Sequence, residues 1–146
     1  MDHSVFDIVV IGAGPAGSRT AARLATGGHS VLLLEKRERI GYPVRCAEAV
    51  GRREDVERYL NLDDELVSSP INGAKVTSPD ARVFEAEMPG IGFTVDRELF
   101  DRRLAEAAVE AGAELRTGHQ AMELIEDNRR VTGAMVKDLG TGDSYR

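Results

Sequence analysis

The sequence has a single cysteine, no tryptophan and no long apolar run. Cys46 cannot form an intrachain disulfide, which is typical of proteins in a reducing cytosol. The longest apolar stretch, Val5 to Ala13, is interrupted by Asp7 and is far shorter than the ~20 residues of a transmembrane helix. No basic segment precedes it, as one would in a signal peptide. We therefore expect a cytoplasmic protein.

The sequence also lacks an excess of positive charge. It has 19 Lys and Arg against 25 Asp and Glu, which gives a net charge of −6. A nucleic-acid partner is not expected, because phosphate binding requires a basic surface. The same charge argues against broad attraction to anionic lipid, although it does not exclude membrane contact. A length of 146 residues with 42% hydrophobic content is sufficient for one globular domain.

The first 35 residues predict a strand–helix–strand unit. Val5–Ile11 is a β-branched run that ends at glycine, as expected for a buried parallel strand. A glycine turn follows, and Pro15–Thr26 has the composition of a helix with proline in its first turn. Ser30–Leu34 is a second apolar strand, with Glu35 at its carboxyl end. This order predicts a βαβ unit.

The turn carries the pattern GxGxxG at Gly12, Gly14 and Gly17. These glycines permit a tight turn, close approach of a pyrophosphate and close helix–strand packing. Glu35 follows at the spacing of a carboxylate that accepts hydrogen bonds from an adenosine ribose, and it would repel a 2′-phosphate. The pattern therefore favours a dinucleotide other than NADP. The alternative is a glycine-rich turn with a surface glutamate.

The middle of the chain is expected to hold a loop, a helix and a β-hairpin. Ile40–Arg45 contains glycine and proline and predicts the loop, and Glu48–Leu60 is plausibly helical. Ile71–Ser78 and Arg82–Met88 predict the two strands of the hairpin. Pro89-Gly90 is expected to end the second of these strands.

The last third predicts a helix followed by an antiparallel meander. Asp96 is the expected N-cap of a helix that runs to about Ala111, and Ala113–Thr117 is a strand. Gln120–Glu126 and Arg130–Lys137 form a hairpin, and Ser144 begins a third strand. The fold class is α/β, a Rossmann-like domain with a parallel sheet and an antiparallel β-meander. An end inside a meander predicts a piece of a longer protein, incomplete at its C-terminus.

Two stretches resemble flavoproteins more than NAD dehydrogenases. Pro15 and Ala16 make the loop GAGPAG, which resembles the two-dinucleotide-binding flavoproteins. The segment VDRELFDRRLAEAAVEAGAEL resembles the aromatic-hydroxylase-like flavoproteins, in which an arginine before the helix contacts FAD. The resemblance implies that residues 1–146 are an FAD/NAD(P)-binding domain of that type. Residues 71–95 would be a small hairpin insertion toward a substrate domain.

The stretch GYPVRCAEAVG, at 41–51, resembles the geranylgeranyl reductase family, including the archaeal digeranylgeranylglycerophospholipid reductases. The resemblance covers the whole chain as the first third of such an enzyme. It implies that reduced FAD delivers hydride to a double bond of an isoprenoid lipid or polyprenyl substrate. The electron donor would be NADPH, NADH or another reductant. A lipid substrate would be compatible with peripheral contact at the inner face of the membrane.

The motif and the resemblance together define the candidate cofactor-binding residues. Ala49 stands where the family usually has glycine, and its methyl group could restrict backbone approach to the flavin. Arg45 could reach the pyrophosphate or could be a solvated loop residue. The full set is Gly12, Gly14, Pro15, Ala16, Gly17, Glu35, Lys36, Arg45, Cys46, Ala47, Ala49, Arg97 and Ala121.

No catalytic residue is identified by the sequence. Cys46 is the one candidate, either beside the flavin as a contact or proton donor, or as a small buried loop residue. His3, His29 and His119 have no partners at metal-ligand spacing and are expected at the surface, so no metal site is predicted. The alternatives to a reductase are a hydroxylase or epoxidase-type monooxygenase, a flavoprotein that relays electrons to quinone, and a nucleotide-binding fold without FAD.

Overall fold

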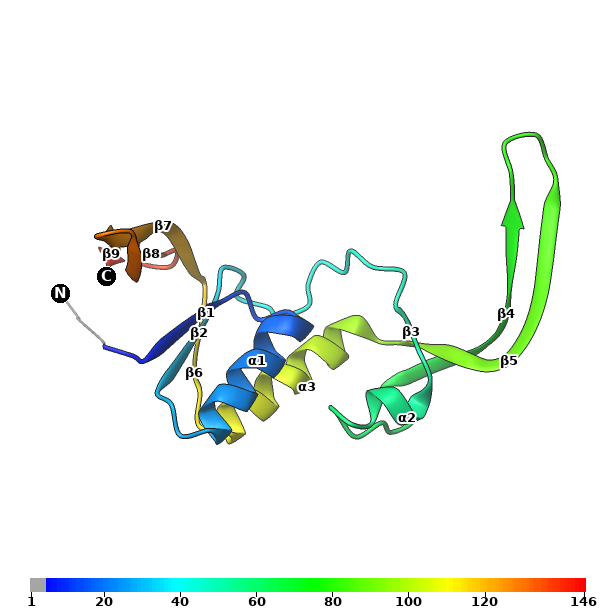
Figure 1. Ribbon diagram of the computed structural model, residues 1–146, viewed down its shortest axis with the longest axis horizontal. Coiled ribbons are helices and arrows are strands. Elements are labelled where there is room, and N and C mark those ends of the chain that lie inside the picture. The colour runs from blue at the N-terminus through cyan, green and yellow to red at the C-terminus, as the bar shows by residue number, and fades with distance from the viewer. Residues whose placement is uncertain (1–4) are drawn as a thin grey trace. The chain divides into compact units, whose positions relative to one another are not determined.

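The computed structural model describes residues 5–146 and divides the chain into two compact units. The first, here the nucleotide unit, combines the residues up to Pro43 with Asp101–Arg146, and the second, the hairpin unit, is Val44–Phe100. Figure 1 labels the elements along the chain. They are β1 (Ile8–Ile11), α1 (Pro15–Thr26), β2 (Val31–Glu35), β3 (Ala49–Val50), α2 (Arg53–Val56), β4 (Val67–Thr77), β5 (Val83–Val95), α3 (Arg97–Glu110), β6 (Glu114–Thr117), β7 (His119–Asp127), β8 (Arg130–Asp138) and β9 (Ser144–Tyr145).

A three-stranded parallel sheet forms the centre of the nucleotide unit, with strand order β1-β2-β6. β2 is buried from Val31 to Leu34, which explains why it is an uninterrupted apolar run. β1 and β6 pair with its two edges, so that Ile11 lies opposite Leu34 and Glu35 lies opposite Thr117. The carboxyl ends of all three strands therefore lie at the same edge of the sheet.

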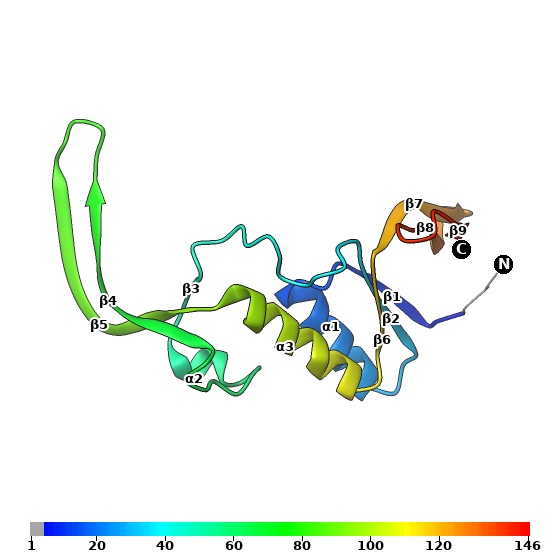
Figure 2. The ribbon, with the colours of Figure 1, turned by 180° about the vertical axis from the view of Figure 1, so that it is seen from behind.

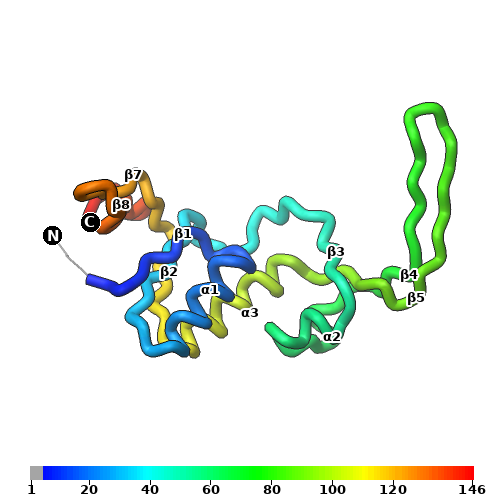
Figure 3. Tube along the Cα trace, viewed as in Figure 1, coloured from blue at the N-terminus to red at the C-terminus, as the bar shows by residue number. Residues whose placement is uncertain are grey.

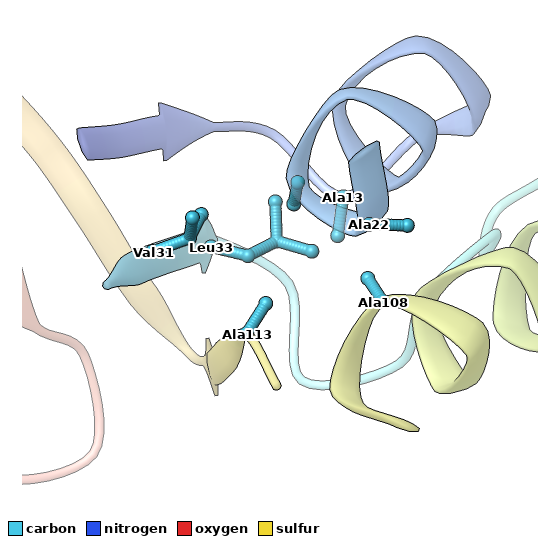
Figure 4. Packing of buried hydrophobic residues seen from close by; sticks show 7 residues of the cluster. Ala13, Ala22, Val31, Leu33, Ala108 and Ala113 are labelled. Atoms are coloured by element: carbon cyan, nitrogen blue, oxygen red, sulfur yellow. The ribbon is translucent and has the colours of Figure 1, made fainter. Parts of the chain in front are cut away.

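Small side chains allow the helices to pack closely on one face of this sheet. Figure 2 shows α1 and α3 side by side against β1, β2 and β6. Ala22 of α1 and Ala108 of α3 meet Val31 and Leu33 of β2 in a buried cluster that Figure 4 shows from close by. Because alanine side chains end at Cβ, the helix backbones can approach the sheet and each other.

An antiparallel meander in the order β7-β8-β9 covers the other side of β2. Leu32 and Leu34 pack there against Ala134 and Val136 of β8. The predicted α/β class, with a parallel βαβ unit and an antiparallel meander, is confirmed. The predicted boundaries of α1 agree with those in the structure, and the third strand expected at Ser144 is present as β9.

The hairpin unit contains one antiparallel sheet in the order β3-β5-β4. Figure 3 shows β4 and β5 as a long two-stranded ribbon joined by a tight turn. At this turn the Ser78 hydroxyl donates to the Asp80 carboxylate and accepts the Arg82 N–H, and the Ser78 N–H donates to the Arg82 carbonyl. The expected hairpin is present, with strands that extend beyond the predicted limits.

Two predictions in the hairpin unit were wrong. The helix expected over Glu48–Leu60 is reduced to the single turn α2, because Ala49 and Val50 instead pair with Thr94 and Phe93 as β3. That partner is distant in sequence, so the local pattern did not reveal it.

The strand break expected at Pro89-Gly90 is also absent, since β5 continues to Val95. The β4–β5 register shifts between Ile71 and Gly73, whose partners are Gly92 and Glu87. The residues between these two partners bulge out, with Gly90 at a φ of +74°. The bulge accommodates the proline without ending the strand.

Candidate functional site

The glycine loop joins β1 to α1 through a turn that only glycine accommodates well. Gly12 has a φ of +99°, and its N–H donates to the Leu34 carbonyl over 2.7 Å. A Cβ at Gly17 would lie 1.8 Å from the Gly12 carbonyl oxygen. No side chain fits at that distance, so Gly17 is what allows α1 to pack directly on the loop.

Gly14 has a different environment, because a Cβ added there would meet no atom within 4 Å. It is the N-cap of α1, with extended backbone and no side-chain cap, and Pro15 follows in the first turn. The N–H groups of Ala16 and Gly17 have no acceptor within the helix, as in any first helical turn. The first turn also has no acidic residue. The loop therefore presents open space and unneutralised positive helix charge.

A buried serine supports the loop from beneath. Ser18 is fully buried, its hydroxyl donates to the Ala13 carbonyl over 3.1 Å, and its N–H donates to the Gly14 carbonyl over 2.9 Å. These bonds fix the two peptides that precede α1. Ser18 was not predicted from the sequence, although its hydroxyl in the first turn of the helix is visible there.

The Glu35 carboxylate lies at the end of β2 and connects two segments. Oε2 accepts the Ala13 N–H and Oε1 accepts the Arg37 N–H, each at 3.0 Å. A carboxylate has about four lone-pair positions, so roughly two remain for a further donor. The backbone bonds hold the side chain in one orientation beside the glycine loop.

A cavity of about 360 Å³ opens beside Glu35. It brings together four of the predicted site residues, Gly12, Glu35, Lys36 and Ala121, from three parts of the nucleotide unit. The other residues that line it were not predicted from the sequence, and they are Ile11, Leu34, Arg37, His119 and Gln120. Since Gln120 and His119 directly precede the predicted Ala121, their place in the sequence could have indicated them.

His119 is not the surface histidine that was expected. Its side chain is 21% exposed, its Nδ1 lies 2.7 Å from the Thr117 carbonyl oxygen, and its ring packs edge-on against Tyr145. The physical reason is that β7 and β9 both flank β8, which brings the two rings together. His29 is exposed, and His3 lies outside the described residues.

The remaining predicted residues belong to the hairpin unit. Arg45, Cys46 and Ala47 lie exposed in the loop before β3, so the alternative of Cys46 as a buried residue was wrong. Its sulfur accepts the Glu48 N–H over 3.4 Å. Ala49 is exposed in β3, opposite Thr94. Arg97 begins α3, and its guanidinium carbon lies 6.0 Å from the centre of the Phe100 ring.

Across residues 5–146, no cluster of three His, Cys, Asp or Glu side chains is placed to hold a metal ion. In the same range, no helix has the length and apolar character needed to cross a membrane. What the described residues do form is a glycine loop at a helix N-terminus, with a carboxylate and a cavity at the adjoining strand end.

Residues 6–145 match the family of pyridine nucleotide-disulphide oxidoreductases, which is nearly the whole chain. The chain belongs to this family. The chain is 43% identical over 141 residues to the digeranylgeranylglycerophospholipid reductase of Methanocella arvoryzae. That match covers 94% of this chain and 36% of the relative, so the chain spans about a third of the length of the curated relatives it matches.

Solved structures show the same fold. A geranylgeranyl bacteriochlorophyll reductase-like protein from Thermoplasma acidophilum superposes with a TM-score of 0.80 at 30% identity, covering 91% of this chain and 35% of that protein. A myxobacterial chondrochloren halogenase, described as a variant of FAD-dependent halogenases, superposes with a TM-score of 0.70 at 21% identity, covering 97% of this chain and 35% of that protein. The halogenase likeness concerns the fold alone.

Proposed function

We propose that this chain binds FAD and forms the cofactor-binding part of a reductase that adds hydrogen to isoprenoid double bonds. The observation that carries the proposal is the arrangement at the carboxyl edge of the parallel sheet. There the Glu35 carboxylate is bonded to the glycine loop at Ala13 and lines a cavity together with Gly12. Dinucleotides bind at this edge in open α/β sheets.

The glycine loop fits a pyrophosphate. The open space at Gly14 admits phosphate oxygens close to the backbone. The N–H groups of Ala16 and Gly17 point out of the first turn of α1, where the helix dipole favours an anion. No acidic side chain in that turn opposes the charge. A phosphate there would gain hydrogen bonds that the helix itself cannot supply.

The cavity beside Glu35 fits the adenosine. The two backbone N–H donors fix the carboxylate and leave capacity for ribose hydroxyls. A 2′-phosphate would be repelled by the same carboxylate, which disfavours NADP at this site. Lys36 and Ala121 line the cavity beyond Glu35 and are proposed as contacts of the adenine end.

Five residues of the hairpin unit are proposed as further FAD contacts. They are Arg45, Cys46, Ala47, Ala49 and Arg97. Two observations support these contacts. The residues lie in the GYPVRCAEAVG and VDRELFD segments, and the loop that precedes β3 is exposed. The residue range 71–95 is proposed as an insertion toward a substrate domain.

The substrate class is proposed from the relatives, which are named as reductases of digeranylgeranylglycerophospholipids. FAD, when bound and reduced, supplies hydride to a carbon–carbon double bond. The residues of this chain bind and orient the cofactor. A lipid substrate favours a cytoplasmic protein with peripheral contact at the inner face of the membrane, and an electron donor such as NADPH or NADH would reduce the flavin.

The proposal is tested by a reduction assay on the full-length protein loaded with FAD. Dithionite replaces the natural electron donor, and a geranylgeranylated glycerophospholipid in mixed micelles is the substrate. We expect product masses that rise in steps of two hydrogens. Gly14→Val, which fills the space proposed for the pyrophosphate, is the matched variant and should lose both FAD and activity. An FAD-loaded, reduced protein that leaves the lipid mass unchanged would overturn the reductase proposal.

A further inference from the structure

The segment that lines the cavity on the β7 side follows a sharp bend between β6 and β7. Gly118 stands at the bend with a φ of +70°. Its N–H donates to the Arg37 carbonyl over 3.2 Å, and its carbonyl accepts the Leu139 N–H over 2.8 Å. One residue therefore connects the segments that follow β2 and β8. The first residues of β7 enter the cavity from this fixed point.

The His119 ring adds a side-chain hydrogen bond to the same bend. Nδ1 lies 2.7 Å from the Thr117 carbonyl oxygen, which can only accept, so Nδ1 carries the hydrogen. This bond spans Gly118 and fixes the ring over the turn. Tyr145 packs against the ring with centroids 5.9 Å apart, at an interplanar angle of 68°. The ring thus has a hydrogen-bond anchor and a packing anchor.

A fixed carboxylate lies on the far side of the ring. Asp138 Oδ1 accepts the Gly140 and Thr141 N–H groups at 2.8 and 3.2 Å. These bonds lower the pKa of the Asp138 carboxyl below its usual value, with a smaller contribution from the adjacent His119. Asp138 Oδ2 lies 3.8 Å from His119 Nε2. Asp138 therefore links the loop after β8 to the same histidine.

We propose that His119 is a positioning residue for the adenine end of the cofactor. This inference rests on the proposed FAD binding. His119, Gln120 and Ala121 line the cavity that also contains Glu35, and Glu35 lies opposite Thr117 in the β2–β6 pairing. An adenosine with its ribose on Glu35 places its base against this segment. By holding the bend through Thr117, His119 sets where the Gln120–Ala121 backbone lies in the cavity.

The test distinguishes the contribution of the Nδ1 hydrogen bond from that of the packing of the ring. Asn at position 119 can keep a donor near the Nδ1 position, whereas Phe keeps a ring against Tyr145 but cannot donate to Thr117. FAD and ADP are titrated into full-length wild type, His119→Asn and His119→Phe, with His29→Asn as an exposed-histidine control. We expect His119→Phe to weaken binding of both ligands about tenfold, as loss of one part-buried hydrogen bond would. His119→Asn and His29→Asn should stay within about threefold of wild type.

A second measurement does not depend on the folding of a variant. Hydrogen exchange of the wild-type amides at Gln120 and Ala121 should slow when ADP is added. Equal ADP affinity in His119→Phe and wild type, equal losses in His119→Asn and His119→Phe, or unchanged exchange at 120–121 on ADP binding would each overturn the inference. A wild type that binds neither FAD nor ADP would instead remove the proposed function, and this inference with it.

Discussion

The nucleotide unit and the hairpin unit differ in how their residues are held. β2 is buried along Val31–Leu34 and is covered on both faces, by helices on one side and by the meander on the other. In the hairpin unit, by contrast, the far part of the β4–β5 ribbon carries Phe84 at 66% exposure and Val76 at 59%. The glycine loop, Glu35 and the cavity beside it all lie in the nucleotide unit, whose central strand is covered in this way. Fixed geometry at the sheet edge is what allows backbone N–H groups and one carboxylate to hold a ligand.

The substitution expected to lower the unfolding free energy most is at Gly17, where the backbone of α1 lies closest to the glycine loop. Gly17→Val would bring a branched side chain onto the Gly12 carbonyl, where even a Cβ would lie at 1.8 Å. We expect a loss of about 3 kcal/mol or more of unfolding free energy, together with FAD binding. Gly51→Val is the matched variant in the hairpin unit, where a Cβ meets nothing within 4 Å. Urea unfolding should show no comparable loss for Gly51→Val, and equal losses in the two variants would contradict the difference between the two units.

Two substitutions to alanine, one in each unit, test the same difference in burial. Leu33 is fully buried between α1, α3 and the sheet, so Leu33→Ala should cost about 2–5 kcal/mol. Phe84→Ala removes a larger side chain from the exposed ribbon, and we expect a change within about 0.5 kcal/mol. Thermal and urea unfolding measure both. A cost at Phe84 as large as that at Leu33 would mean that the ribbon is covered in the folded protein.

A smaller effect should appear in acid. The Ser30 N–H and hydroxyl both donate to the Asp7 carboxylate and lower its pKa from 3.8. A depressed folded-state pKa contributes stability above the unfolded value, and this stability is lost as the pH falls through the folded value. Asp7→Asn should therefore flatten the stability–pH curve of the nucleotide unit below about pH 4. An unchanged slope in denaturant titrations between wild type and variant would contradict this prediction.

The sequence predicted the nucleotide unit better than the hairpin unit because its signals are local. The limits of α1 follow from Pro15 at its start and Gly27-Gly28 at its end, which act within one turn. The partners of Ala49 and Val50 are more than forty residues away, so no local pattern predicts β3 over a helix. In the site, the motif indicated Gly12 and Glu35, whereas the contacts of His119 with Asp138 and Tyr145 arise only in the folded meander.

In the proposed function, the Glu35 carboxylate holds the adenosine half of FAD. The measurement is the Kd of FAD for the full-length protein carrying Glu35→Gln, against Glu38→Gln as a control that makes the same charge change on an exposed residue outside the cavity lining. Loss of charge-assisted bonds predicts a Kd about 10- to 100-fold higher for Glu35→Gln. Glu38→Gln should match wild type. Equal FAD affinity in Glu35→Gln and wild type would contradict the account.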